Sequence, residues 1–112
     1  MNYTDILKKL KKFRDDRDWK QFHDSKNLAL ALSIEASELN ELFLWKETKE
    51  SENINNERLS EELADILSYA FLIADKHNLD PFDIILQKIK KNSKKYPVEK
   101  SKGKSTKYSD LK

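Results

Sequence analysis

Two pairs of acidic residues have a spacing that suits metal binding. Glu35 and Glu38 form one pair, and Glu62 and Asp65 form the other. Residues three apart are neighbours on a helix, so both side chains of a pair can reach one ion. In helical projection, both pairs fall on the apolar side of their segment, where leucine and isoleucine recur. Carboxylates packed together there would repel one another and lose hydration, which costs several kcal/mol for each unpaired ion.

A divalent cation is the partner that this arrangement predicts. Of the basic residues on the same two segments, only Arg58 and Lys76 point roughly toward the acids. Mg²⁺ prefers carboxylate oxygens, waters and substrate phosphates, and Mn²⁺ is an alternative. A single E-x-x-E tetrapeptide can arise by chance on a solvated face, because 38% of the chain is charged. Two inward pairs on consecutive helices favour the metal, so all four carboxylates are predicted ligands, with Glu38 as the candidate general base.

Four helices are predicted to position these residues. The chain has a single glycine, Gly103, and only one proline before residue 97, Pro81, so helix breakers are few. Apolar residues recur at helical spacing over about residues 5–15, 27–46, 57–77 and 81–95. The polar segment 47–56 is predicted as a linker that makes the second and third helices antiparallel. The predicted fold class is all-α, with a four-helix bundle subunit and an ordered loop over the site at residues 16–26.

Composition excludes several other kinds of site. The chain has 112 residues and no cysteine, which excludes disulfides, zinc–thiolate sites and a cysteine nucleophile. With one glycine, no glycine-rich loop can hold phosphates. The N-terminus lacks the apolar core of a signal peptide, and no window approaches about 18 uninterrupted apolar residues. We therefore expect a soluble cytoplasmic protein, and we expect it to form homo-oligomers because a small charged chain buries a modest core.

Charge divides the chain unevenly. Residues 86–112 hold ten lysines against two acidic residues, a net charge of +8, so the first 85 residues carry −6. We predict a single helical catalytic domain over residues 1–96. Residues 97–112 are predicted to be a basic tail that docks on the body or on a neighbouring subunit.

The acidic motif resembles that of the MazG-like all-α nucleoside triphosphate pyrophosphohydrolases. Their signature is E-E-x-x-E, a spacer, and E-E-x-x-D. Here residues 34–38 read I-E-A-S-E and residues 61–65 read E-E-L-A-D, so Ile34 replaces the first glutamate. The match looks closer still to the dCTP pyrophosphatase branch of the family. That likeness covers nearly the whole chain and includes residues 17–23, 27–28, 41–46, 88 with 92, 96–98, and 107–108.

The resemblance implies a four-helix subunit that forms a homodimer or homotetramer. It implies Mg²⁺-dependent hydrolysis of a deoxynucleoside triphosphate, with dCTP or a modified dCTP favoured, to the monophosphate and pyrophosphate. The metal would bridge the four carboxylates and the phosphates. The implied substrate-binding residues are Trp19, His23, Asn27, Trp45, Tyr69, Lys88 and Asn92.

Some of these roles have a plainer alternative. Trp19, His23 and Trp45 would form the base pocket, although tryptophans also anchor small helical cores. Tyr69 would give its hydroxyl to a phosphate or sugar, or simply pack. Lys88 and Asn92, four residues apart on the fourth helix, would reach the phosphates.

Other functions compete with this prediction. The same chemistry could act on dUTP or on damaged nucleotides. A non-enzymatic module that binds nucleic acid through the basic terminus, or one that binds another protein, is a further alternative. The acidic face would repel a phosphate backbone, so we expect no nucleic-acid partner. We expect no membrane partner either, because the chain has no long apolar window.

Overall fold

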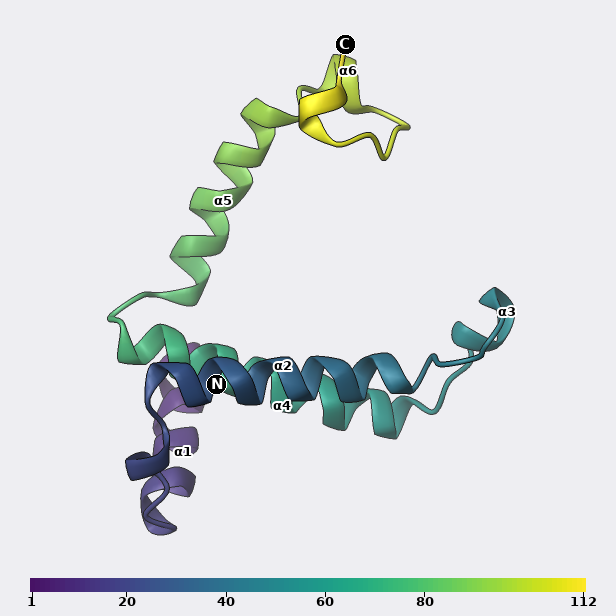
Figure 1. The fold of residues 1–112 in the computed structure, drawn as a ribbon. Helices are drawn as coiled ribbons and strands as arrows, with labels where there is room; N and C mark the ends of the chain where they lie inside the picture. The colour runs from purple at the N-terminus through teal and green to yellow at the C-terminus, as the bar shows by residue number, and fades with distance from the viewer. The chain divides into compact units, whose positions relative to one another are not determined.

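The protein is helical throughout. The computed structural model describes residues 1–112 and contains no β-strand, which confirms the predicted all-α class (Figure 1). Four longer helices are present, as predicted. The elements in order are α1 (Tyr3–Asp16), a 3₁₀ turn (Lys20–Phe22), α2 (Ser25–Glu41), α3 (Thr48–Ser51), α4 (Asn56–Lys76), α5 (Pro81–Lys95), α6 (Val98–Ser101) and a second 3₁₀ turn (Tyr108–Asp110). None of these helices is both long and apolar enough to cross a bilayer.

The chain divides into two compact units. The first comprises residues 1–78 and the second residues 79–112. The first unit contains both acidic pairs, and the second contains α5 and the basic tail. The predicted division between a catalytic domain, residues 1–96, and a tail, residues 97–112, stays a prediction.

Within the first unit, α2 and α4 lie side by side and antiparallel (Figure 1). Their contact buries Leu28 of α2 and Leu72 of α4, at 2% and 7% exposure. Helix α1 contacts α4, where the rings of Tyr3 and Phe71 meet edge to face at 5.1 Å between centroids. Each of these two antiparallel helices carries one of the acidic pairs.

Side chains fix where the helices begin. The side chain of Asn2 accepts a hydrogen bond from the backbone N–H of Asp5, whose carboxylate bonds back, so the first helix starts slightly earlier than predicted. Asp24 caps α2 with its carboxylate alone, which accepts a hydrogen bond of 2.7 Å from the backbone N–H of Asn27. Before α5, the carboxylate of Asp80 accepts from two backbone N–H groups, and Pro81 occupies the first turn as expected.

The second predicted helix ends earlier than its apolar pattern suggested. Helix α2 stops at Glu41, and the next backbone hydrogen bonds span three residues rather than four. Trp45 then adopts a left-handed backbone with φ of 62°. A side chain rarely occupies this region, so the helix cannot continue through the position. The expected linker also holds one helical turn, α3.

In the second unit, the tail folds against the end of its own helix. The rings of Tyr96 and Tyr108 meet edge to face, with 6.0 Å between their centroids. The ammonium of Lys95 lies 4.7 Å from the centre of the Tyr108 ring, a cation–π geometry. The end of the tail therefore contacts the end of α5. Docking of the tail on the body or on a neighbouring subunit stays a prediction.

Candidate metal centre and base pocket

The antiparallel helices bring acids from both pairs together. Glu35 of α2 and Glu62 and Asp65 of α4 each present a carboxylate oxygen, and these oxygens all lie within 4.8 Å of one another. The two helices face each other at this level, so the i, i+3 pairs project into the same space. Three of the four predicted ligands therefore form a single cluster.

Glu38, the fourth predicted ligand, lies at the edge of this cluster. It is exposed, and its carboxyl interacts by hydrogen bonding and by charge with both Glu35 and Glu62. It does not belong to the group of three whose oxygens lie within 4.8 Å.

Electrostatics shows that the cluster lacks a positive partner. Burial, followed by hydrogen bonding to Glu38 and the charges of the neighbouring acids, raises the pKa of Glu35 to about 7. Burial and the charge of Glu38 also raise the pKa of Glu62. One buried oxygen of Glu35 and one of Glu62 have no hydrogen-bond partner. No ion pair in the structure involves these acids.

These residues fit a hard divalent cation. Unpartnered buried carboxylate oxygens are costly, and a cation would satisfy them and remove the mutual repulsion. The donor set consists only of oxygen, which suits Mg²⁺ or Mn²⁺ better than softer metals.

An aromatic cavity adjoins the cluster. It has a volume of about 130 Å³ and includes Asp65 in its wall. Three of the predicted substrate-binding residues, Trp19, His23 and Tyr69, line it as well. The other lining residues are Leu10, Phe13, Arg14, Ser68 and Leu72. One small space thus joins a candidate metal ligand to aromatic rings that can stack on a base.

The rings in this cavity hold one another in place. Trp19 packs edge to face on Phe13, with 5.7 Å between ring centres, and His23 packs on Tyr69 at 6.3 Å. Burial and the charge of Arg14 lower the pKa of His23, so its imidazole is neutral near pH 7. Its Nδ1 is buried without a partner and can accept or donate one hydrogen bond.

Tyr69 is set up as a hydrogen-bond donor. Burial and the negative charges of Glu35 and Asp65 raise the pKa of its hydroxyl. The hydroxyl therefore keeps its proton at neutral pH and can donate to an acceptor on a ligand.

Asn27 has a local structural role in this chain. Its side-chain amide donates a hydrogen bond to the carbonyl oxygen of Phe22 at 3.1 Å. That bond ties the start of α2 to the 3₁₀ turn that precedes His23. Asn27 can thus position the base pocket, and its direct contact with a substrate stays a prediction.

The structure does not bring Trp45 to the other predicted pocket residues. It follows the C-terminal end of α2, whereas Trp19 and His23 precede the N-terminal end. A 17-residue helix is roughly 25 Å long, so the two indoles lie at opposite ends of it. Trp45 is 91% exposed, and its role stays a prediction.

Lys88 and Asn92 both lie on α5 in the second unit. Lys88 is exposed and Asn92 is half-buried. Their predicted contact with phosphates stays a prediction.

Sequence reasoning missed Arg14, although it lines the aromatic cavity and only 12% of its side chain is exposed. It lies four residues after Leu10 and seven after Leu7, on the apolar face of the first helix, and that position is the signal that could have found it. Phe13 also carried a signal, because it continues the apolar face of that helix.

Sequence comparisons with known proteins identify the relatives of this chain. The family model described as MazG-like matches residues 30–111. The dCTP pyrophosphatase 1 of Bos taurus is 40% identical, over 96% of this chain, and that of Homo sapiens is 37% identical over the same share. The chain spans 66% of the length of each of these relatives.

A solved structure shares the fold. The crystal structure of a pyrophosphatase from Archaeoglobus fulgidus superposes with a TM-score of 0.80 at 36% sequence identity. The match covers 84% of this chain and 91% of that one. The family model matches most of the chain, the architecture is all-α, and the paired acids lie on antiparallel helices. The chain therefore belongs to the MazG-like family.

Proposed function

We propose that the protein is a nucleoside triphosphate pyrophosphohydrolase that hydrolyses dCTP or a modified dCTP to the monophosphate and pyrophosphate, with Mg²⁺ as cofactor. The observation that carries the proposal is the position of Asp65. Its side chain belongs to the carboxylate cluster and also lines the aromatic cavity. A ligand with a polyphosphate at one end and a flat ring at the other matches both features. The dCTP pyrophosphatase relatives support the same substrate class.

In this proposal, Glu35, Glu38, Glu62 and Asp65 hold the metal. When bound, the cation neutralises the triphosphate and lowers the pKa of a bound water, and Mn²⁺ could substitute for Mg²⁺. Glu38 differs from the others because it is exposed at the edge of the cluster. A carboxylate in that position can accept the proton of an attacking water, which makes Glu38 the proposed general base.

The aromatic cavity would hold the nucleoside end. Trp19 would stack on the base, and the imidazole of His23 would offer a hydrogen bond to its edge through the unpartnered Nδ1. The Tyr69 hydroxyl, which stays protonated, would donate to the sugar or to a phosphate oxygen. Asn27 would keep His23 in place through its bond to the 3₁₀ turn. Lys88 and Asn92 would bind phosphate oxygens, and Trp45 of a second copy would complete the base pocket.

A homodimer or homotetramer is part of the proposal. No apolar side chain is fully buried, and the only buried apolar residues are Leu28, Leu42, Leu72, Ala74 and Pro81. Several large apolar side chains are at least two-fifths exposed, among them Leu30, Ile34, Leu63 and Leu67. Exposed apolar surface of this extent marks an interaction site. A second copy would cover it and would also supply another Trp45, which one chain cannot bring to its own pocket. We propose a cytoplasmic location for this assembly.

A panel of triphosphates with Mg²⁺ tests the function. We expect dCTP and its 5-modified forms to give monophosphate and pyrophosphate, with slower hydrolysis of dATP, dGTP and dTTP. Faster hydrolysis of dUTP or of a damaged nucleotide would transfer the proposal to that substrate. Release of orthophosphate and a diphosphate would contradict the proposed cleavage. Tight nucleic-acid binding without any hydrolysis would favour the non-enzymatic alternative.

A further inference from the structure

A second cavity in the first unit is lined mainly by basic side chains. Its volume is about 270 Å³, twice that of the aromatic cavity. Its wall comprises Lys11, Arg14, Lys20, His23, Leu28, Leu72, Asp75 and Lys76. Helix α1, the 3₁₀ turn and the end of α4 each contribute cations, so the charge is gathered from three separate elements.

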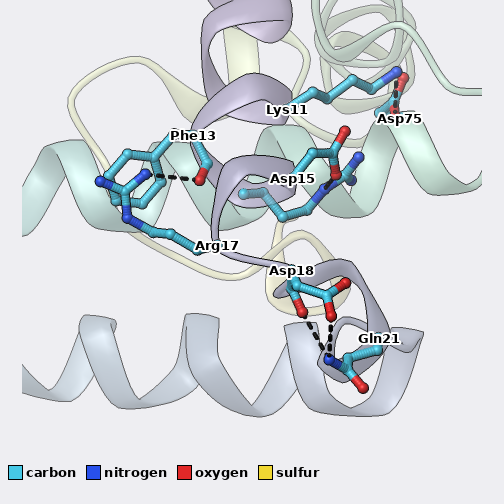
Figure 2. A network of polar contacts seen from close by, with 8 residues as sticks. Lys11, Phe13, Asp15, Arg17, Asp18, Gln21 and Asp75 are labelled. Atoms are coloured by element: carbon cyan, nitrogen blue, oxygen red, sulfur yellow. Dashed lines mark hydrogen bonds and ion pairs between the residues drawn. The ribbon is translucent and has the colours of Figure 1, made fainter.

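Two of the cations already have acidic partners. The ammonium of Lys11 lies 2.9 Å from the carboxylate of Asp75, across the contact between α1 and α4 (Figure 2). The Nε of Arg14 donates to Asp15 at 2.8 Å, and this bond uses one of the five guanidinium N–H groups. The other N–H groups of Arg14 can serve another acceptor.

Lys20 and Lys76 take part in no ion pair. With four cations and the single carboxylate of Asp75, the cavity lining carries a net charge of +3. Helices α1 and α4 both end near this cavity, and each C-terminal end contributes roughly half a negative charge. The helix ends, together with the Asp15 carboxylate bonded to Arg14, offset part of the positive charge, and a net of about +1 remains.

The cavity also has one lining polar atom without a partner and two apolar side chains in its wall. The Nδ1 of His23 is buried and makes no hydrogen bond. Leu28 and Leu72 are almost fully buried beneath the charges. Apolar walls reduce screening by water, so the cations act more strongly on an anion inside than they would at an open surface.

We propose that this basic cavity binds a phosphate-bearing anion, at a site separate from the carboxylate cluster. Arginine and lysine together are the side chains that recognise phosphate, by forked hydrogen bonds and by point charge respectively. The carboxylate cluster repels anions when no metal is present, so the basic cavity is the place in the first unit where an anion would bind without metal. The proposal goes beyond the proposed reaction and does not require that dCTP be the substrate.

The cavity is positioned to influence the base pocket. Arg14, His23 and Leu72 line both cavities. An anion in the basic cavity would therefore contact the same imidazole that faces the base. Free pyrophosphate and the phosphate of a nucleotide share this chemistry, and either can act as the anion.

A titration without metal tests the proposal. Inorganic pyrophosphate is added to the protein in EDTA at constant ionic strength, and binding is followed by NMR and calorimetry. We expect the largest NMR shifts at Lys20, His23 and Lys76. The variant Lys20→Gln/Lys76→Gln should weaken pyrophosphate binding about tenfold or more, which corresponds to about 1.4 kcal/mol.

A matched variant controls for the loss of general positive charge. Lys9→Gln/Lys49→Gln removes two exposed lysines of the first unit that line neither this cavity nor the aromatic one. It should bind pyrophosphate like the unaltered protein. Equal weakening in both double variants, or shifts confined to the carboxylate cluster, would overturn the proposal. Absence of pyrophosphate binding to the unaltered protein would also overturn it.

Two further measurements complete the test. Thermal melting of both double variants without anion confirms that they fold. A parallel titration with dCMP in EDTA identifies the source of the anion, because a nucleotide that binds more tightly than pyrophosphate, and still depends on Lys20 and Lys76, would be the preferred ligand. Hydrolysis of dCTP with Mg²⁺ is measured separately, so loss of the proposed function and loss of the anion site are distinguishable.

Discussion

At the scale of single residues, the same carboxylates that would bind a metal repel one another when no metal is bound. Glu35 and Glu62 each retain a buried oxygen without a hydrogen-bond partner. The free-energy cost of these unpaired oxygens is offset only when a cation binds. Stability and activity should therefore respond in opposite directions when one of these charges is removed.

Glu62→Gln tests this opposition directly. In Mg²⁺, we expect triphosphate hydrolysis to fall by about 100-fold or more, because the amide is a poor ligand and several kcal/mol of charge stabilisation is lost. In EDTA, we expect the melting temperature to rise, because one repelling charge is gone. Steady-state kinetics and thermal melting provide the two measurements.

Glu61→Gln is the matched control for that change. Glu61 is the preceding residue of α4, is exposed, and lies outside the cluster. Its substitution should change both the rate and the melting temperature little. If Glu61→Gln lost as much activity as Glu62→Gln, the assignment of ligands by helix face would be wrong.

The raised pKa of Glu35 predicts a pH dependence. Its carboxyl titrates near 7 in the folded chain, against 4.5 in an unfolded one. Between these values the folded state holds a proton that the unfolded state has lost. The free energy of unfolding in EDTA should therefore fall as pH rises from about 5 to about 8.

Thermal melts in EDTA between pH 5 and pH 8 measure this slope. Glu35→Gln should flatten it, because the amide does not titrate. With Mg²⁺, the unaltered protein should become more stable as pH rises, since the ion binds the ionised carboxylates. A metal-free protein with the same stability at pH 5 and pH 8 would contradict the role assigned to Glu35.

At the scale of elements, the start of α2 connects the fold to the base pocket. The carboxylate of Asp24 caps the helix, and the amide of Asn27 bonds the carbonyl oxygen of Phe22. These two bonds fix the 3₁₀ turn against the helix, and His23 lies between them. Disturbing the cap should therefore affect both stability and substrate binding.

Asp24→Ala should lower the free energy of unfolding by about 1 kcal/mol, because the first turn of α2 loses its acceptor. We also expect a higher KM with a smaller change in kcat, since the turn bearing His23 loosens while the carboxylates stay in place. Urea unfolding and steady-state kinetics measure the two effects. Asp24→Asn retains an acceptor oxygen and should restore both values. Failure of that rescue would show that the charge of Asp24, rather than the cap, matters.

At the scale of the whole molecule, many large apolar side chains are exposed and only a few are buried. Leu63 and Leu67 lie one turn apart on α4, at 41% and 53% exposure. A surface of this kind predicts association between copies. Light scattering after gel filtration should give a mass that is a multiple of the 13.3 kDa chain.

Leu63→Glu/Leu67→Glu should shift this mass toward one chain, because burying two carboxylates at an interface is costly. Lys9→Glu, an exposed substitution on α1, is the control and should leave the mass unchanged. Circular dichroism verifies that each variant stays helical. A single-chain mass for the unaltered protein would contradict the proposed assembly.

The sequence by itself determined the helical class and the pairing of the acids, because both follow from spacing along one chain. Glu35 with Glu38, and Glu62 with Asp65, are neighbours on any helix. The antiparallel order of the second and third helices also followed from a short polar linker. Helix ends were less predictable, since the left-handed backbone at Trp45 leaves no mark in the apolar pattern.

Only the tertiary structure decided which surfaces meet. It joined Asp65 to the aromatic cavity, placed Trp45 at the opposite end of α2 from Trp19, and gathered Arg14 and Lys76 around one basic cavity. These relations depend on how separate helices pack, and the packing is set by many weak contacts between residues distant in the chain. The periodicity of apolar residues indicates the helix face on which a residue lies. Which residues of another helix contact that face depends on how the helices pack.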